Sequence, residues 1–182
     1  VLVASIDPAP SLADALRTPL GPRPTRIPRV NGQLSAVEID PSRALDRWLA
    51  GRRETLERLA VEGTWLDHED VSRLLKLSLP GIDELAALLE ISRLAAERTV
   101  DLVVVDTAPT GHTLRMLALP ATLGDIAAVF DHMREKARVM ESALTGRWRP
   151  GAGDALVEEL ARTAADLAAL LRDPDRTRVS WV

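Results

Sequence analysis

Two aspartates occupy matching positions in this chain, and their surroundings suggest chemistry on phosphate. Asp7 follows the mainly apolar residues 1–6, and Asp106 follows the apolar residues 102–105. A proline stands within three residues after each aspartate. Open α/β sheets bind ligands at the carboxyl ends of their strands, so two neighbouring strands would bring both carboxylates to one crevice. Paired carboxylates there suit the handling of Mg²⁺ and water in phosphoryl transfer.

Plainer explanations of both aspartates remain open on the residues alone. Asp106 can be the polar end of an ordinary strand. Asp7 can be a strand-end acid that caps a helix beginning near Ser11. Neither explanation requires a ligand.

The residues after Asp106 add a second feature of phosphate chemistry. Residues 107–111 have turn composition, and residues 113–119 favour a helix that we expect Pro120 to end. In nucleotide-hydrolysing α/β proteins, a strand, an acid, a glycine-bearing turn and a helix follow one another in this way. That arrangement places the carboxylate near Mg²⁺ and a backbone N–H near the γ-phosphate.

The alternation of elements around this stretch predicts an α/β protein. Buried strands are expected at 1–6, 34–39 and 102–105, and the start of another at 179–182. Helices are expected at 11–17, 41–63, 82–98, 113–119, 122–144 and 154–173, with a short helix and turn at 67–79. This order predicts an open, mostly parallel sheet with helices on both faces.

Local signals indicate where some of these elements begin. Ser11 is a good N-cap, and with Asp14 three residues later it forms a variant of the capping box. Asp154 is a candidate N-cap for the last helix. Residues 18–32 contain too many prolines and glycines for a helix or a strand.

The composition is that of one globular domain. The chain has 182 residues, of which 46% are hydrophobic and 27% charged. A net charge of −4 provides no basic field, so we expect no nucleic-acid partner. No cysteine is present, so this segment forms no disulfide and no thiolate metal site. With no apolar run of bilayer length and no signal peptide, we expect a cytoplasmic protein.

Five stretches of the chain resemble one protein family, in the family's own order. They are residues 5–16 (SIDPAPSLADAL), 36–41 (AVEIDP), 80–85 (PGIDEL), 106–120 (DTAPTGHTLRMLALP) and 173–182 (DPDRTRVSWV). In these stretches the sequence is similar to the P-loop ATPases that include the arsenite-pump ATPase and the guided-entry ATPase for tail-anchored membrane proteins. The resemblance covers nearly the whole chain.

This resemblance implies roles for four residues. Asp7 would orient or activate the attacking water, and Asp106 would hold Mg²⁺ through a water molecule. Gly111 would offer its backbone N–H to the γ-phosphate. Thr107, directly after Asp106, is a further candidate for nucleotide binding. The cofactors implied are therefore ATP and Mg²⁺.

The resemblance also implies an architecture and an assembly. We expect a P-loop NTPase-like fold, incomplete here, as a single partial ATPase domain over residues 1–182. Inserted helical portions, at about 41–79 and 122–150, would face a partner. The intact protein would be a homodimer that couples ATP hydrolysis to transport or protein targeting.

Two departures from the family's pattern qualify this expectation. Pro10 stands where the family usually has histidine, which leaves Asp7 intact. The phosphate-loop motifs GxxxxGK[ST] and KGGxGKT do not occur, and no Gly-Lys pair exists in the chain. We therefore expect an internal piece of a longer ATPase that is inactive by itself. A non-hydrolysing protein-binding module derived from the family is the alternative.

An apolar stripe on the expected helix 122–144 is the candidate partner surface. Its members recur at spacings of three and four: Leu123, Ile126, Phe130, Met133, Ala137, Met140 and Leu144. Packing against a neighbouring helix is the alternative. Because methionine suits adaptable binding surfaces, Phe130, Met133 and Met140 are the candidate contacts. The absence of cysteine favours a hydrophobic protein client or membrane-protein partner over arsenite.

Overall fold

The computed structural model describes residues 1–7, 11–28, 30, 32–63, 81–97, 100–107, 110–145 and 151–180. The chain divides into two compact units. The sheet unit comprises Val1–Trp48 and Pro80–Leu117, and the helical unit comprises Leu49–Leu79 and Ala118–Val182. The short helix and turn expected at 67–79 lie outside the described residues.

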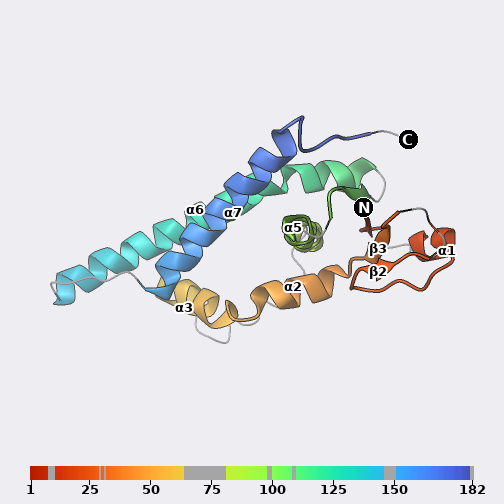
Figure 1. Cartoon of the computed structure of the whole chain (residues 1–182). Coiled ribbons are helices and arrows are strands. Elements are labelled where there is room, and N and C mark those ends of the chain that lie inside the picture. Colours follow the sequence, from red (N-terminus) through yellow and green to blue (C-terminus); the bar gives the residue numbers. More distant parts are fainter. Residues whose placement is uncertain are drawn as a thin grey trace. The chain divides into compact units, whose positions relative to one another are not determined.

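In the described residues, the sheet unit contains a four-stranded sheet in which three strands are parallel. The ribbon in Figure 1 shows the sheet beside helix α1 (Leu12–Leu16). The strands are β1 (Leu2–Ser5), β2 (Thr25–Arg26), β3 (Ser35–Glu38) and β4 (Val103–Asp106). Their order is β2-β3-β1-β4, with β1 parallel to both β3 and β4. Strand β2 runs antiparallel to β3. The expectation of an α/β fold with a mostly parallel sheet is therefore confirmed.

The core of the sheet unit lies between one face of the sheet and helix α5 (Ile82–Ala96). Side chains alternate along a strand, so every second residue of β1, β3 and β4 points to this face. The buried cluster contains Leu2, Ala4, Val37, Ile39, Ala87, Ile91 and Leu94, and Ile6, Val100, Val103 and Val105 pack against it. The residues that alternate with these along the strands, among them Ser5, Glu38 and Asp106, belong to the opposite face.

The expectation that strand β4 is covered on both faces is wrong for the described part of the chain. Leu102 is 54% exposed and Val104 is 45% exposed. Of the two faces of β4, the one with Val103 and Val105 packs against the core cluster of the sheet unit, whereas Leu102 and Val104 belong to the other face. An unbroken apolar run therefore does not establish that both faces of a strand are covered.

A buried ion pair connects two helices of the sheet unit. Glu90 of α5 is 7% exposed and accepts a hydrogen bond from Arg93 at 2.8 Å. Arg47 of α2 (Pro41–Leu49) lies 3.0 Å from the same carboxylate oxygen. Burial raises the pKa of Glu90, but the hydrogen bonds and charges of the two arginines outweigh it and hold the pKa below its ordinary value.

Helix α1 (Leu12–Leu16) begins without the expected capping box. Ser11 is its N-cap but makes no side-chain capping hydrogen bond. Its φ of −100° and ψ of −20° are helical angles, whereas a capping hydroxyl needs the extended backbone. The N–H of Ala13 is instead accepted by Glu38 Oε1 at 3.2 Å.

Two other expected element limits are wrong for reasons of backbone geometry. The helix expected at 41–63 is broken into α2 and α3 (Arg53–Gly63), because Gly51 adopts a left-handed φ of +78°. The proline-rich residues 18–32 contain strand β2, which occupies the edge of the sheet, where proline in the flanking chain is tolerated.

Helix α6 (Thr110–Thr145) continues through Pro120, so the expectation of two helices divided by that proline is wrong. A proline inside a helix removes one hydrogen bond but does not have to end the helix when surrounding contacts compensate. Pro120 is itself buried, between the buried Leu119 and Leu123.

The last helix, α7 (Ala152–Arg172), begins earlier than expected. Gly151 is its N-cap, and Asp154 lies in the first turn. Asp154 Oδ2 accepts the N–H of Gly151 at 2.5 Å, so this carboxylate serves the helix start from inside the helix. Residues 179–180 are not in a strand, contrary to expectation, and 181–182 lie outside the described residues.

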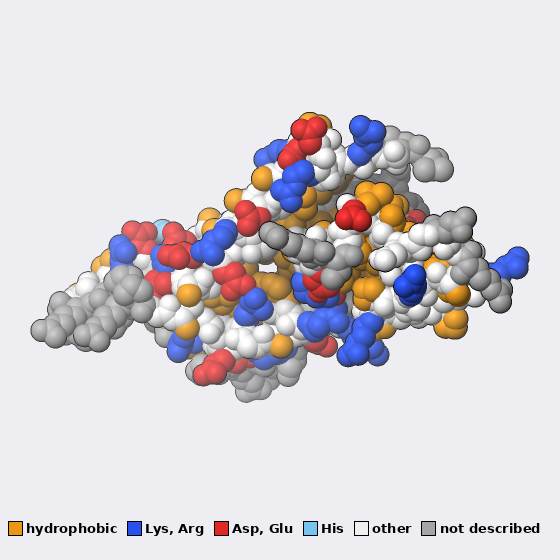
Figure 2. All heavy atoms as spheres, in the orientation of Figure 1, with side chains coloured by type: hydrophobic (Ala, Val, Ile, Leu, Met, Phe, Trp, Pro, Cys, Tyr) orange, Lys and Arg blue, Asp and Glu red, His pale blue; other side chains and the backbone are white. Residues whose placement is uncertain are grey.

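The described part of the helical unit contains α3, α7 and the later part of α6 (Figure 1). Helices α6 and α7 run antiparallel, because Gly124 approaches Ala164 while Arg134 pairs with Asp154 at 2.6 Å. Helix α3 meets α7 where Gly153 faces Leu59, and a Cβ at Gly153 would lie 2.7 Å from that leucine. On the face in Figure 2, acidic and basic side chains are intermingled. Among the described helices, none is long and apolar enough to span a membrane.

Candidate functional site

The two aspartates singled out by the sequence end neighbouring parallel strands. Asp106 is the last residue of β4 and is paired in register with Ser5, the last residue of β1. The N–H of Ile6 donates to the carbonyl oxygen of Asp106 at 3.0 Å, which continues the pairing past Ser5. Asp7 follows directly. The placement of both acids at the carboxyl ends of adjacent parallel strands is confirmed. That their carboxylates share one crevice stays a prediction.

Ser5 connects these two aspartates, and the sequence analysis missed it. Its hydroxyl donates to Asp106 Oδ2 at 3.4 Å and accepts the N–H of Asp7 at 3.4 Å. Ser5 is 2% exposed, whereas both aspartates are half-buried. Because one oxygen makes both contacts, the Asp7 amide and the Asp106 carboxylate lie within two hydrogen-bond lengths of each other. The available signal was alternation, which places Ser5 and Asp7 on the same side of one strand.

Glu38 is a third carboxylate at this edge of the sheet. It is the last residue of β3 and is paired in register with Ser5. Its side chain accepts the N–H of Ala13, and its own N–H donates to the carbonyl oxygen of Gly21 at 3.1 Å. Glu38 therefore holds the start of α1 and the loop that follows it.

Thr107 and Gly111 lie close to Asp106 in the chain but differ in burial and in secondary structure. Thr107 is half-buried directly after β4. Gly111 is the second residue of α6 and is exposed, with nothing within 4 Å of a Cβ built on it. Its N–H belongs to the first helical turn, whose N–H groups have no partner within the helix. Pro10, which replaces the family's usual histidine, lies outside the described residues.

The oxygen donors at this edge fit Mg²⁺. Magnesium prefers carboxylate oxygen, and proteins usually hold it with one or two carboxylates while it keeps water and substrate phosphate as its other ligands. Among the described residues, no group of three or more His, Cys, Asp or Glu could enclose a metal ion. The half-buried Asp106 suits a site in which one or two carboxylates hold Mg²⁺ together with water and substrate phosphate.

The residues of the candidate partner stripe differ in how deeply they are buried. Leu123 is 2% exposed and therefore belongs to the core of the helical unit. Phe130 and Met133 are half-buried, and the side chain of Met140 lies outside the described residues. Among the described side chains on this part of α6, the most exposed large apolar one is Val139, at 62%.

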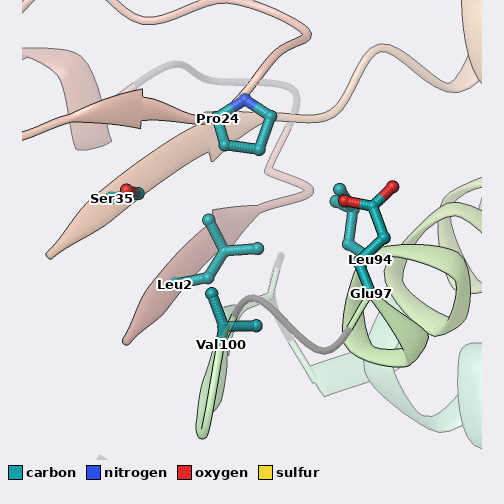
Figure 3. Close-up of a pocket in the computed structure, with 6 residues that line it drawn as sticks. All are labelled: Leu2, Pro24, Ser35, Leu94, Glu97 and Val100. Atoms are coloured by element: carbon teal, nitrogen blue, oxygen red, sulfur yellow. The ribbon is translucent and has the colours of Figure 1, made fainter. Parts of the chain in front are cut away.

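A pocket of about 130 Å³ lies at the opposite end of the strands from the carboxylates (Figure 3). Figure 3 shows Leu94 of α5 and Glu97, the C-cap of that helix, on one side of the pocket and Leu2 on the other. The lining residues are Leu2, Pro24, Ser35, Leu94, Glu97 and Val100. Leu2 and Ser35 are the first residues of β1 and β3, so this pocket is separate from the carboxylate edge.

A mostly parallel sheet with acids at the carboxyl ends of adjacent strands is the arrangement of nucleotide-hydrolysing α/β proteins. A model of the family described as anion-transporting ATPase matches residues 1–182. The chain belongs to this family.

Individual relatives agree with this assignment. The chain is 38% identical to the ATPase ASNA1 homolog of Leishmania braziliensis over 149 residues, which cover 73% of this chain and 36% of that protein. It is 36% identical to the ATPase get3 of Schizosaccharomyces japonicus, covering 82% of this chain and 40% of that protein. It is 33% identical to the ATPase GET3 of Phaeosphaeria nodorum, covering 97% and 56%. The chain thus spans only about 36% to 56% of the length of these relatives.

Proposed function

We propose that this chain is part of an ATPase that hydrolyses ATP with Mg²⁺ and couples nucleotide state to a partner-binding helical surface. The observation that carries the proposal is the placement of Asp7 and Asp106 at the carboxyl ends of adjacent parallel strands, joined through Ser5. Membership of the anion-transporting ATPase family and the names of the relatives support ATPase chemistry. The intact protein would act as a homodimer in the cytoplasm.

The residues at the sheet edge would divide the work as follows. Asp106 would hold Mg²⁺ through a water molecule, and the ion would neutralise charge developing on the phosphate oxygens. Asp7 would orient the attacking water. Gly111 would donate its N–H to the γ-phosphate, with Thr107 beside it. Glu38, whose carboxylate accepts the N–H of Ala13 at the start of α1, is assigned no part in this work.

Helix α6 offers a route from this site to a partner. Its first residues belong to the sheet unit and the rest to the helical unit, so a single helix contains both Gly111 and the candidate contacts. A change at Gly111 on hydrolysis would then act on the helix that carries Phe130, Met133 and Met140. A hydrophobic protein client or membrane-protein partner fits these side chains, and the sequence has no cysteine with which to bind arsenite.

The test is an Asp106→Asn substitution in the full-length protein. We expect turnover of Mg-ATP to fall by about a hundredfold or more, since the amide lacks the charge that attracts Mg²⁺. Asp101→Asn is the matched control, because Asp101 is an exposed aspartate before the other end of β4. Steady-state phosphate release, measured over a range of Mg²⁺ concentrations, gives the turnover rates of the two variants.

Two results would count against the proposal. Equal activity of the two variants would remove Asp106 from the mechanism. Tight binding of Mg-ATP by the wild type without turnover would instead favour the alternative, a non-hydrolysing protein-binding module.

A further inference from the structure

Ser5 is the most deeply buried polar side chain at the carboxylate edge. It is 2% exposed and stands in register between Glu38 on β3 and Asp106 on β4. A buried hydroxyl needs hydrogen-bond partners, since an unpaired one loses its hydration without compensation. The partners of Ser5 are two groups of the candidate site: the Asp106 carboxylate and the Asp7 amide.

We propose that Ser5 is a positioning residue that fixes the Asp106 carboxylate and the Asp7 backbone relative to each other for ATP hydrolysis. The inference rests on the proposed function, and it adds a residue to which that function assigned no separate role. Ser5 touches neither ATP nor water in this account. It acts through the two aspartates.

The direction of the two hydrogen bonds supports this role. A serine hydroxyl has one proton and two lone pairs, so Ser5 can donate to Asp106 while it accepts from Asp7. Hydrogen bonds in such a chain polarise one another, and each strengthens the next. The Asp7 amide, the Ser5 hydroxyl and the Asp106 carboxylate form a chain of this kind.

The torsion of the aspartate side chain explains why such a contact matters. The last torsion of an aspartate is broad and has no sharp preferred angle. Hydrogen bonds therefore decide the direction in which the Asp106 oxygens point. By occupying Oδ2, Ser5 sets the rotation of the carboxylate that would face Mg²⁺.

The lengths of the contacts are consistent with a site that tightens in use. Both contacts measure 3.4 Å, which is long for hydrogen bonds. Catalytic hydrogen bonds commonly shorten when the substrate complex forms. Small rotations of Ser5 and Asp106 would shorten both.

Ser5→Ala in the full-length protein tests the proposal, with Ser35→Ala as the matched control. Ser35 is the first residue of neighbouring strand β3, so the same substitution is made at the other end of the sheet. With Ser5→Ala, we expect kcat to fall about tenfold while KM for Mg-ATP changes less than about twofold. Ser5→Cys, whose thiol is a weaker donor, should give an intermediate kcat. Ser35→Ala should leave both constants unchanged.

A second readout does not depend on activity. Amide hydrogen exchange resolved at Asp7 should become several-fold faster in Ser5→Ala, because the acceptor of that N–H is gone. The amide of Ala13, held by Glu38, is the internal control and should keep its rate. A purely structural role of Ser5 would lower the melting temperature without separating kcat from KM.

Two results overturn the inference. One is unchanged exchange at Asp7 in Ser5→Ala, and the other is equal kinetic behaviour of Ser5→Ala and Ser35→Ala. Failure of the proposed function gives a different result, in which wild type and Ser35→Ala alike turn over no Mg-ATP.

Discussion

At the scale of single residues, the three acids at the carboxylate edge differ in their hydrogen-bond partners. Glu38 accepts the N–H of Ala13, Asp106 accepts the hydroxyl of Ser5, and Asp7 donates its own amide to that hydroxyl. A carboxylate that holds secondary structure is less free to meet a ligand. Glu38 is therefore assigned a structural role at the start of α1.

Glu90 provides a residue-scale prediction that concerns stability instead of chemistry. Glu90→Gln should lower the free energy of unfolding by about 1–2 kcal/mol at pH 7, since the loss of charge weakens its bonds to two half-exposed arginines. Glu97→Gln, at the C-cap of the same helix, is the matched control. Glu97 also pairs with Arg93 but is 46% exposed, so its loss should cost less than about 0.5 kcal/mol. Urea unfolding of the full-length variants measures both changes.

The stability difference between wild type and Glu90→Gln should depend on pH. The folded pKa of Glu90 lies below its ordinary value of 4.5, so its stabilisation is fully present above pH 4.5. It is lost as the pH falls through the folded pKa. The stability difference between wild type and Glu90→Gln should therefore be constant from pH 7 to pH 5.5 and shrink only in stronger acid. A difference that shrinks between pH 7 and pH 5.5 would contradict this assignment.

At the scale of elements, helix α6 contains core residues and candidate contact residues on one stripe. Leu123 is buried in the helical unit, whereas Met133 is half-buried. A charge should therefore be tolerated at Met133 and not at Leu123. This contrast separates a partner surface from a helix-packing surface.

We predict that Met133→Glu weakens binding of a hydrophobic partner while the protein stays folded. Leu123→Glu, the same change on the same helix, should destabilise the protein by about 3 kcal/mol or more, because it buries an unpaired charge. Circular dichroism melting gives the stabilities. Fluorescence anisotropy with a labelled, leucine-rich synthetic peptide of about 20 residues, the length of a membrane span, gives the binding. Equal loss of melting temperature in both variants would make Met133 a core residue.

Element limits show which structural features local sequence signals could predict. The strands before Asp7 and Asp106 were predicted because an apolar run ended by an acid is a local pattern. The break at Gly51 was not predicted, although its signal is also local: a glycine there can adopt the left-handed conformation that ends α2. The continuation of α6 through Pro120 depends on surrounding contacts, which no local rule contains.

The parts of the site that sequence analysis missed depend on long-range register. Ser5 gains its role only because β4, about a hundred residues later in the chain, pairs with β1. Glu38 gains its role because β3 places it near the start of α1. The residues that flank Ser5 and Glu38 in the sequence indicate neither the contact of Ser5 with Asp106 nor the contact of Glu38 with α1.

At the scale of the whole molecule, two compact units share one helix. The sheet unit carries the acids and the first turn of α6, and the helical unit carries the candidate contacts. The central claim of this account is that the sheet unit performs phosphoryl transfer and that Asp7 acts on the attacking water.

Single-turnover hydrolysis of bound ATP by full-length Asp7→Asn tests this claim most directly, because it separates chemistry from nucleotide binding. We predict that Mg-ATP binds with an affinity within about threefold of wild type, while the rate of phosphate formation falls by about a hundredfold or more. The change removes a charge that orients water and leaves the phosphate contacts in place. Equal losses of binding and hydrolysis, or a wild-type rate in the variant, would contradict the account.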